Sequence, residues 1–531
     1  MKKKQSLWGH GAVLVLTSVL LLSGASRADT QNLFKLSKEV PHLRVIWIGV
    51  LEGSWREIGN QYGQRCAQDI AKNFDTRWEN SVLKGNALWQ KERPAEEERA
   101  EYCAKYIARS HKELTYLSPE LVELFEGIGQ GAAEELGKSI YADVLPNVLK
   151  ITLLNSGITA HPNWDFANDR PFKTDKKSNK NREGYSDPDG HDCNGLWVKG
   201  AATKTGFTYA MRAAQGSHIS RGSSGRERQV SYVAIPDDPK ARVFWSTGRA
   251  GNLGGGPGGG VLNDHGVCVL TSGCSYSEEN WEQVDVTCAP GIKDFVLASY
   301  GVIFSKTARE AAEKATVGTP EYRKRTGRKT VLRARGANIV FADPKEAICV
   351  EQNARRYAIR EPGYMGEKEN NYIVHANHFK YDAGSFDEEG VFHEDEPMTM
   401  YEPEEYSKST YYRFWSGMHV VLNNYGQIDE KMMLSEIAPL HTGYEKDGTA
   451  LPPNPDGTPS AARTFCSHLP PFTDDMPLGR GGNTETTVFN LSTLEVWYVP
   501  VWPCHYKEWN LSWNYVNLKP FAKYREMLEK D

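Results

Sequence analysis

The sequence predicts an α+β fold in which helices cover antiparallel β-sheets. Three observations point to this class: residues 53–155 follow a helical pattern, short β-branched and aromatic runs recur from residue 193 onward, and helical stretches separate some of these runs. The chain has 531 residues, of which 39% are hydrophobic and 25% charged, so it is large enough to bury a sizeable core.

The first 28 residues have the features of a secretory signal peptide. Three lysines lie within residues 1–10, residues 11–22 are apolar, and the Ser-Arg-Ala at 26–28 is a small-x-small cleavage site. The apolar run is shorter than a membrane-spanning helix requires, and no later stretch approaches 18 apolar residues. An uncleaved anchor is the alternative. We expect residues 1–28 to be removed and the mature chain to be secreted or periplasmic, without a stable membrane anchor.

The net charge argues against nucleic-acid binding. The full sequence has a formal charge of −5, and removing the first 28 residues, which hold four basic and no acidic side chains, brings it to −9. A nucleic-acid-binding domain needs a basic surface to meet the phosphate backbone. We therefore expect no nucleic-acid partner.

The segment after the signal is predicted to be helical. Residues 42–50 alternate like a strand and lead into an amphipathic helix that opens near Gly53. Ser118-Pro119 marks another helix start, with Ser as N-cap and Pro at the first position. We expect residues 29–160 to form a helical segment. Residues 161–192 are polar and rich in Pro, Gly and Asn, which is typical of a surface linker.

From Cys193 onward the pattern changes to β. Residues 196–198 and 207–211, joined by a Lys-Thr-Gly turn at 204–206, predict a hairpin. Further strands are expected at residues 230–235, 242–246, 267–271, 338–341, 347–351, 372–375, 486–490 and 495–499, and helices at 291–300, 307–315 and 411–423.

The chain has nine cysteines, and export would permit disulfides among them. They are Cys66, Cys103, Cys193, Cys268, Cys274, Cys288, Cys349, Cys466 and Cys504. An odd number leaves at least one thiol outside a disulfide. The sequence has no CxxC motif and no Cys/His cluster with zinc-ligand spacing, and His441, His468 and His505 are scattered along it. We expect no metal and no other cofactor, with Cys66–Cys103 as a candidate disulfide.

Cys193 is the thiol with the most specific chemical prediction. It follows the polar linker and opens the predicted hairpin. If its sulfur attacks the carbonyl of Asp192, an N→S acyl shift and hydrolysis leave Cys193 at a new N-terminus. The thiol then lies beside a free α-amine of pKa ~8, which can accept the thiol proton near neutral pH. A half-buried strand cysteine and one half of a disulfide are the alternatives.

Several short motifs occur in a fixed order. They are G-x-x-x-E-x-G-x-Q-x-G at residues 53–63, CNGLWV at 193–198 with YAMR at 209–212, NDHGV at 263–267, ANIVFAD at 337–343 with Glu351, NHF at 377–379, STYYR at 409–413, CSH at 466–468 and PC at 503–504. Together they resemble the cysteine N-terminal-nucleophile (Ntn) hydrolases, and most closely the acyl-coenzyme A:6-aminopenicillanic acid acyltransferase-like group, peptidase C45. Bile salt hydrolases, penicillin V acylases and acid ceramidase are relatives of this group. The resemblance spans residues 45–506.

The resemblance implies a fold, a chain organisation and a reaction. The fold would be a four-layer αββα sandwich with a helical N-terminal pro-segment. Residues 29–160 would form the small chain, 161–192 a linker ending at the autocleavage site, and 193–531 the catalytic chain. The enzyme would hydrolyse a non-peptide C–N amide of a small-molecule acyl-amide substrate through a thioester acyl-enzyme. Acyl transfer to a second amine stays open.

The resemblance also implies roles for individual residues. Cys193 would be the nucleophile and, through its amine, the general base. Arg212 would favour the thiolate, and Asn377 would donate its amide to the oxyanion, with a second donor from the backbone near residues 273–274. Arg413 would brace the nucleophile or the substrate. Without the resemblance, the alternatives are a sheet-surface Arg212, an Asx turn at Asn377 and a helix-surface Arg413.

One departure from the family pattern bears on function. The family usually has Arg-x-x-Asp where this chain has Arg212-Ala-Ala-Gln215. Glutamine can accept a hydrogen bond from the α-amine but supplies no negative charge, so either another acid stands in or processing is less efficient. Asp192, where the acyltransferase group often has Gly, is a milder departure. A non-catalytic periplasmic binding protein on the same fold, which Gln215 favours, is a competing hypothesis. A phospholipase-B-like esterase on a related scaffold is another. The acyl group and the oligomeric state do not follow from the sequence.

Overall fold

The computed structural model combines helices and two large sheets, which confirms the α+β class. It describes residues 34–35, 45–79, 96–140, 145–155, 164–165, 170–171, 193–217, 229–254, 260–274, 289–334, 336–398, 408–452, 464–466, 468–469, 481–500, 502–504 and 513–529. The predicted signal peptide, Asp192 and Cys288 lie outside these residues. So does the predicted linker, apart from the short strands β3 (Trp164–Asp165) and β4 (Arg170–Pro171).

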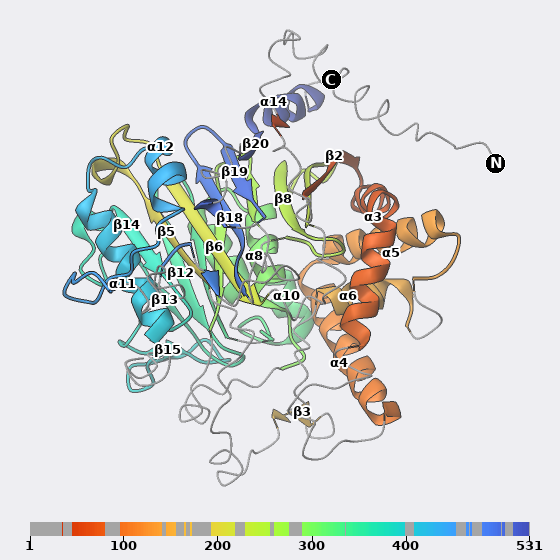
Figure 1. The fold of residues 1–531 in the computed structure, drawn as a ribbon. Helices are drawn as coiled ribbons and strands as arrows, with labels where there is room; N and C mark the ends of the chain where they lie inside the picture. The colour runs from red at the N-terminus through yellow and green to blue at the C-terminus, as the bar shows by residue number, and fades with distance from the viewer. Residues whose placement is uncertain are drawn as a thin grey trace.

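Four helices form the N-terminal part of the described chain, grouped on one side of the molecule in Figure 1. They are α3 (Trp55–Trp78), α4 (Glu96–Leu117), α5 (Pro119–Leu136) and α6 (Asn147–Leu154). The predicted start of α5 is confirmed, because the side chain of Ser118 accepts a hydrogen bond from the backbone N–H of Leu121 at 3.3 Å. Helix α3 begins with a capping box, in which Ser54 and Glu57 satisfy each other's backbone N–H groups.

Glycines allow α3 and α5 to pack in direct backbone contact. A Cβ placed on Gly59 or Gly63 of α3 would lie 2.2 Å from a carbonyl oxygen of α5, and one placed on Gly127 or Gly131 of α5 would lie 2.2 Å from a carbonyl of α3. Any larger side chain at these four positions would push the helices apart. Two of them, Gly59 and Gly63, belong to the first sequence motif, so that motif has a packing role.

The predicted disulfide between Cys66 and Cys103 is wrong. Both side chains are buried free cysteines, Cys66 on α3 and Cys103 on α4. Helix α4 packs mainly against α5 and α6, whereas α3 packs mainly against α5. Burial raises the pKa of Cys103 to about 11, which keeps the thiol protonated and unreactive.

Ten strands form the larger sheet. In spatial order they are β16 (Phe392–His393), β15 (Ser385–Phe386), β13 (Tyr357–Arg360), β12 (Ala347–Gln352), β11 (Ala337–Ala342), β10 (Cys268–Gly273), β9 (Val261–Asn263), β8 (Phe244–Arg249), β7 (Gln229–Pro236) and β2 (Val45–Gly53). The pairing is antiparallel, as expected, except at one edge, where β2 runs parallel to β7. The N-terminal segment therefore contributes a strand to this sheet as well as helices.

The smaller sheet has eight strands and contains Cys193. Its path is β1 (Phe34–Lys35), β20 (Asn514–Asn517), β19 (Glu495–Val499), β18 (Gly481–Asn490), β6 (Tyr209–Ser217), β5 (Cys193–Val198) and β14 (Tyr372–His375), and β17 (His468–Leu469) pairs with β18. The predicted hairpin is confirmed as β5 and β6, joined through the 3₁₀ turn Gly200–Ala202. Its register places Cys193 opposite Ala214.

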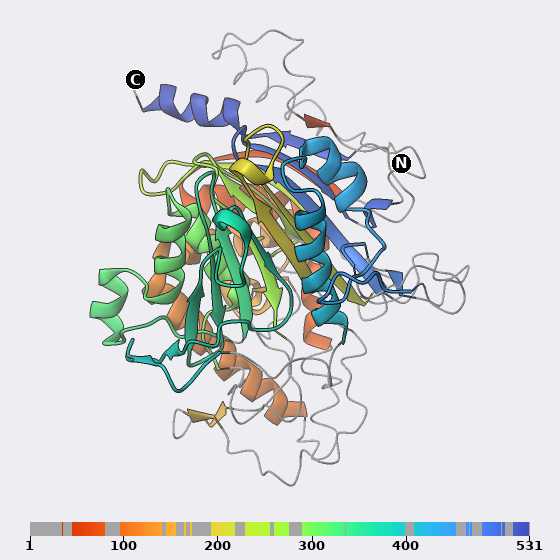
Figure 2. The same cartoon turned by 90° about the vertical axis from the view of Figure 1, so that its left-hand side faces the viewer.

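Three hydrophobic clusters show how helices and sheets pack. The first joins α3–α6, α8 (Asp294–Ile303) and α9 (Ala308–Thr316) to the ten-stranded sheet. The second draws on both sheets, with Trp245 of β8 in edge-to-face contact with Phe489 of β18. The third joins the eight-stranded sheet to α11 (Lys408–Asn423) and the short helices α12 (Glu430–Met432) and Met433–Ile437. Figure 2 shows α11 lying along the strands of that sheet.

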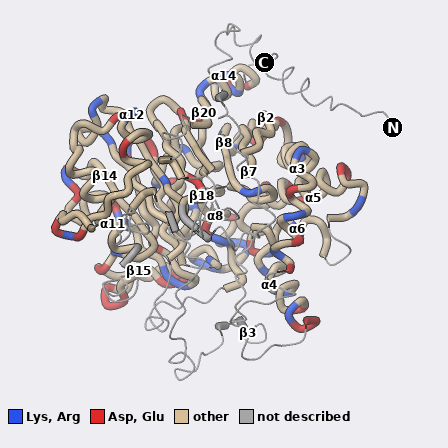
Figure 3. The backbone as a smooth tube through the Cα atoms, in the orientation of Figure 1, with Lys and Arg blue, Asp and Glu red and all other residues tan. Residues whose placement is uncertain are grey.

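The other helices among the described residues are α10 (Pro320–Thr326), the 3₁₀ turn Lys368–Asn370 and α14 (Lys519–Leu528). Acidic and basic residues are interspersed along the described chain (Figure 3), with three glutamates at the N-terminal end of α4, where the helix dipole favours them.

No helix among the described residues has the length and apolar character needed to span a membrane.

Candidate active site

Cys193 begins β5 and lies between two neighbouring strands. Strand β6 pairs with β5 on one side and β14 on the other, with His375 of β14 opposite Gly195. The chain therefore places Asn377, two residues past His375, beside Cys193. The backbone nitrogen of Cys193 donates a hydrogen bond to Oδ1 of Asn377 at 2.6 Å, and the Cys193 residue is only 2% exposed.

Asn377 contacts the backbone of Cys193 through its side-chain amide. Its Oδ1 accepts from Cys193 N at 2.6 Å and from Arg413 Nη1 at 2.7 Å, while its Nδ2 donates to the carbonyl of Gly273. Two donors on one atom identify that atom as the oxygen and so fix the orientation of the amide. The N–H of Cys274, near the expected second oxyanion donor, donates to Gly336 at 3.3 Å.

Arg413 is a buried arginine that faces Cys193. It projects from α11, is 0% exposed, and donates from Nη1 to the carbonyl oxygen of Cys193 at 2.5 Å as well as to Asn377. The alternative of a helix-surface arginine is therefore wrong. Hydrogen bonds from a charged donor are stronger than neutral ones, so Arg413 stabilises the position of the Cys193 backbone.

Arg212 links the two sheets beneath Cys193. It lies on β6 opposite Gly195, is 2% exposed, and donates from Nε to the carbonyl of Thr271 on β10 at 2.9 Å. The alternative of a sheet-surface arginine is wrong as well. Because Arg212 and Ala214 are two residues apart on one strand, the Arg212 side chain lies on the same face of the sheet as that of Cys193.

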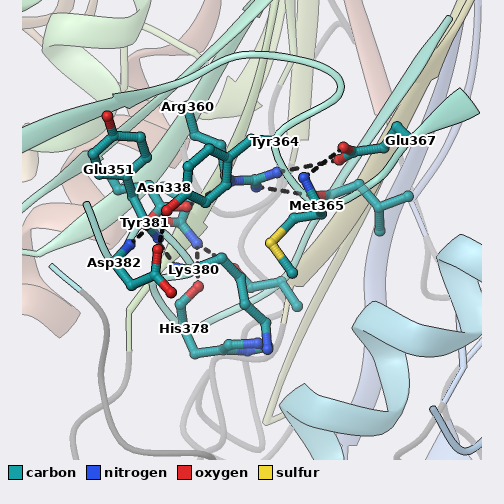
Figure 4. A network of polar contacts seen from close by, with 12 residues as sticks. Asn338, Glu351, Arg360, Tyr364, Met365, Glu367, His378, Lys380, Tyr381 and Asp382 are labelled. Atoms are coloured by element: carbon teal, nitrogen blue, oxygen red, sulfur yellow. Dashed lines mark hydrogen bonds and ion pairs between the residues drawn. The ribbon is translucent and has the colours of Figure 1, made fainter. Parts of the chain in front are cut away.

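The loop that carries Asn377 is held by Asn338 of β11. The Nδ2 of Asn338 donates to the carbonyls of Ala376 at 2.8 Å and of His378 at 2.7 Å, which flank Asn377 on both sides (Figure 4). Asn338 is fully buried. The motif ANIVFAD at 337–343 thus supplies the side chain that fixes the backbone around Asn377.

Glu351 of β12 holds the next part of the same loop. Its Oε2 accepts from the backbone N–H groups of Lys380 at 2.7 Å and Tyr381 at 2.9 Å, and its Oε1 accepts from Nε of Arg360 at 2.7 Å. Both members of the ion pair are 0% exposed, and Arg360 also donates to the carbonyl of Val374 on β14 at 3.0 Å (Figure 4). This buried network sets the position of the loop relative to β14 and hence to Cys193.

His375 lies next to the site, and the sequence analysis missed it. Its Nδ1 lies 2.8 Å from the hydroxyl of Ser272 on β10, and its Nε2 would lie 2.5 Å from a Cβ on Gly195. Burial, reinforced by three nearby arginines, lowers the pKa of His375 well below its usual value. The imidazole is therefore neutral, and Gly195 is required because a larger residue would collide with it.

Glu485 is a second residue that the sequence analysis missed. It lies on β18 opposite Ala214, the residue that pairs with Cys193, so the three form one row across the sheet. Directly paired residues project to the same face, which places the Glu485 carboxylate on the face of Cys193. Glu485 is 1% exposed and accepts a hydrogen bond from Thr487 Oγ1 at 2.6 Å. Gln215 lies on β6 in register with Asn483, and its side chain lies outside the described part of the structure.

Comparison with known proteins gives weak similarities only. No family model matches the chain, and no curated protein matches it. Two variant structures of the conjugated bile acid hydrolase from Clostridium perfringens have 11% identity, cover 58% of this chain and 89% and 88% of theirs, and give TM-scores of 0.31 and 0.28. Penicillin V acylase from Agrobacterium tumefaciens has 10% identity, covers 58% of this chain and 75% of its own, and gives a TM-score of 0.17. All of these TM-scores are below 0.5, so the proposals below depend on contacts within this chain.

Proposed function

We propose that this protein is a self-processing cysteine Ntn amidohydrolase that cleaves a non-peptide C–N amide through a thioester acyl-enzyme. The observation that carries the proposal is that buried side chains hydrogen-bond to both backbone polar groups of Cys193, at the start of β5. Its backbone N–H is held by Asn377 and its carbonyl by Arg413, both buried. Two buried side chains, one of them an arginine, are thus committed to the backbone of a single cysteine, which supports a role for that cysteine beyond packing.

Processing would begin with attack of the Cys193 sulfur on the carbonyl carbon of Asp192. The C–N bond breaks as the S–C bond forms, the Cys193 nitrogen takes up the thiol proton, and water then hydrolyses the thioester to give the Asp192 carboxylate and a free thiol. Oδ1 of Asn377 already accepts from the Cys193 nitrogen. The same acceptor can hold that nitrogen once it has become an α-amine.

Turnover would repeat this chemistry on a substrate amide. The α-amine of Cys193 takes the thiol proton, the thiolate attacks the acyl carbon, and the proton returns to the leaving amine. Water then cleaves the thioester, or a second amine does so in an acyl transfer. The buried positive charge of Arg212, on the same face of the sheet, favours the thiolate.

Glu485 would be the acid that stands in for the Asp of the family pattern. The chain has Gln215 at that pattern position, and Glu485 lies in the row of Cys193 and Ala214 on the same face. Its negative charge would stabilise the ammonium form of the α-amine and keep the positive charge of Arg212 balanced. It is a positioning residue, since only Cys193 reacts with the acyl group.

The chain organisation belongs to the same proposal. Residues 1–28 would be a signal peptide that directs the protein to the periplasm or the outside, 29–160 the small chain, 161–192 the linker that ends at the cut, and 193–531 the catalytic chain. The three hydrophobic clusters support a four-layer αββα arrangement, with helices on the outer face of each sheet.

Substrate assays separate this proposal from its competitors. Chromogenic amides and the matching esters of the same acyl groups are offered to the wild type, to Cys193→Ala and to Cys103→Ala, which removes a buried thiol far from the site. We expect amide turnover in the wild type and in Cys103→Ala, and a loss of at least about 10³-fold in Cys193→Ala. Amide turnover that survives in Cys193→Ala overturns the proposal. Turnover of esters alone favours the esterase, and ligand binding without turnover favours the binding protein.

A further inference from the structure

Three potential metal ligands converge at the end of the eight-stranded sheet where β18 starts and β19 ends. His441, Cys466 and Cys504 each offer one ligand atom, and all three atoms lie within 4.8 Å of one another. His441 follows the helix Met433–Ile437, Cys466 lies ahead of β17, and Cys504 follows β19. Sequence spacing could not reveal the group, because its members come from three separate segments.

Backbone contacts hold two of these segments together. The N–H of Cys466 donates to the carbonyl of Leu440 at 3.1 Å, which fixes Cys466 against the residue that precedes His441. The neighbouring carbonyl of Phe465 accepts from Nδ2 of Asn483 on β18 at 2.8 Å. These two contacts tie the Cys466 segment to β18 of the sheet and to the residue that precedes His441.

The surroundings of the two sulfurs are apolar. Cys466 is 1% and Cys504 5% exposed, and both belong to a small cluster with Val499 and Trp502. Isolated thiolates would be unstable in such a place, because burial disfavours the charged form. A bound divalent cation reverses this, since it neutralises the thiolates and replaces the two thiol protons.

We propose that His441, Cys466 and Cys504 bind a zinc ion. Thiolate and imidazole are the ligands that Zn²⁺ prefers, and two cysteines with one histidine form a known zinc ligand set. Zinc bonds of about 2.3 Å to sulfur and about 2.0 Å to nitrogen put the ligand atoms of a tetrahedron roughly 3.5–3.8 Å apart. Ligand atoms within 4.8 Å of one another need only small rotamer changes to reach that spacing. Three protein ligands leave one position for water or a further side chain.

The zinc ion would stabilise the end of the sheet next to the Cys193 strand. Asn483, which holds the Cys466 segment, is in register with Gln215 of β6, the strand that pairs with β5. Loss of the ion would loosen the start of β18. This inference does not rest on the proposed hydrolase activity, and its test reads metal content.

The test measures zinc in the full-length protein, purified after expression with added zinc salt and without chelators. We expect about one zinc per chain in the wild type and in Cys103→Ser, and at least about a tenfold loss in the double variant Cys466→Ser/Cys504→Ser. Since that variant could misfold, the wild type is also loaded with Co²⁺. A thiolate-to-cobalt charge-transfer band in the near ultraviolet then supports the site.

Two results overturn the inference. One is wild-type protein without zinc and without the cobalt band at saturating metal. The other is a Cys466–Cys504 disulfide in the protein as purified, detected by peptide mapping and by a mass lower by two hydrogens. Neither result bears on whether Cys193 is the nucleophile, so failure here is distinguishable from failure of the proposed function.

Discussion

Replacing Glu351 with Gln tests whether the buried network around the Asn377 loop holds the site together. The substitution keeps the size of the side chain and removes its charge. Glu351 accepts three hydrogen bonds, from Arg360 and from two backbone N–H groups of the loop, and is 0% exposed. Glutamine has one oxygen, so its NH₂ must face either Arg360 or the backbone donors.

Both orientations carry a large cost. If the NH₂ faces Arg360, the buried guanidinium loses its close carboxylate partner. Among the described residues, Glu367 also pairs with Arg360, at the longer distance of 3.7 Å. Breaking such a pair costs about 3–5 kcal/mol. If the NH₂ faces the loop, two buried N–H groups lose their acceptor, at about 1–3 kcal/mol each. At about 1 °C per kcal/mol in a chain of this size, the melting temperature should fall by roughly 2–6 °C.

Calorimetry of Glu351→Gln beside Glu346→Gln provides the assay. Glu346 pairs with Arg309 at 2.9 Å, but the two side chains are 33% and 57% exposed, so that pair contributes about 0–1 kcal/mol. We expect Glu346→Gln to melt within about 1 °C of the wild type. Equal melting temperatures for the two variants would refute the claim that the buried network positions the loop.

Three further outcomes follow from the site. Asn377→Ala removes the acceptor of the Cys193 nitrogen together with the amide N–H expected to donate to the oxyanion, and loss of such a donor should slow processing about 10²–10³-fold. Processing is followed as fragment appearance over time, and a change below twofold contradicts the role of Asn377. Glu485→Gln should shift the pH profile of amide turnover while Glu430→Gln leaves it unchanged, and identical profiles would remove Glu485 from the mechanism. The lowered pKa of His375 means that the unfolded chain binds a proton the native state does not, so stability should fall below pH ~6.5 by about 1.4 kcal/mol per pH unit. The denaturant midpoint should therefore change more between pH 7.5 and pH 5.5 in the wild type than in His375→Gln. The same change in both proteins would contradict a lowered pKa of His375.

The order of the elements could be predicted because their signals are local. Capping at Ser118, the hairpin after Cys193 and the strand at 372–375 each depend on a few neighbouring residues, and each is confirmed. Asn377 follows the strand at 372–375 by two residues, and it lies beside Cys193 because this strand pairs with the strand that Cys193 begins. Predicting that contact would have required knowing that these two strands pair. That information is not in any single segment.

The rest depends on long-range packing that the sequence does not display. Glu485 reaches the row of Cys193 through two strand pairings, and a register shift after Asn483 sets its position. The wrong Cys66–Cys103 disulfide has the same origin, since the pattern identified the helices and not which of them are neighbours. The convergence of His441 with Cys466 and Cys504, which are distant in sequence, also depends on long-range packing.

N-terminal sequencing of the purified wild type beside Cys193→Ala tests the proposed mechanism most directly. We predict two chains in the wild type, the larger beginning Cys-Asn-Gly-Leu-Trp, and one continuous chain in the variant. An uncut wild type that hydrolyses amides, or a variant cut at the same bond, would contradict the mechanism.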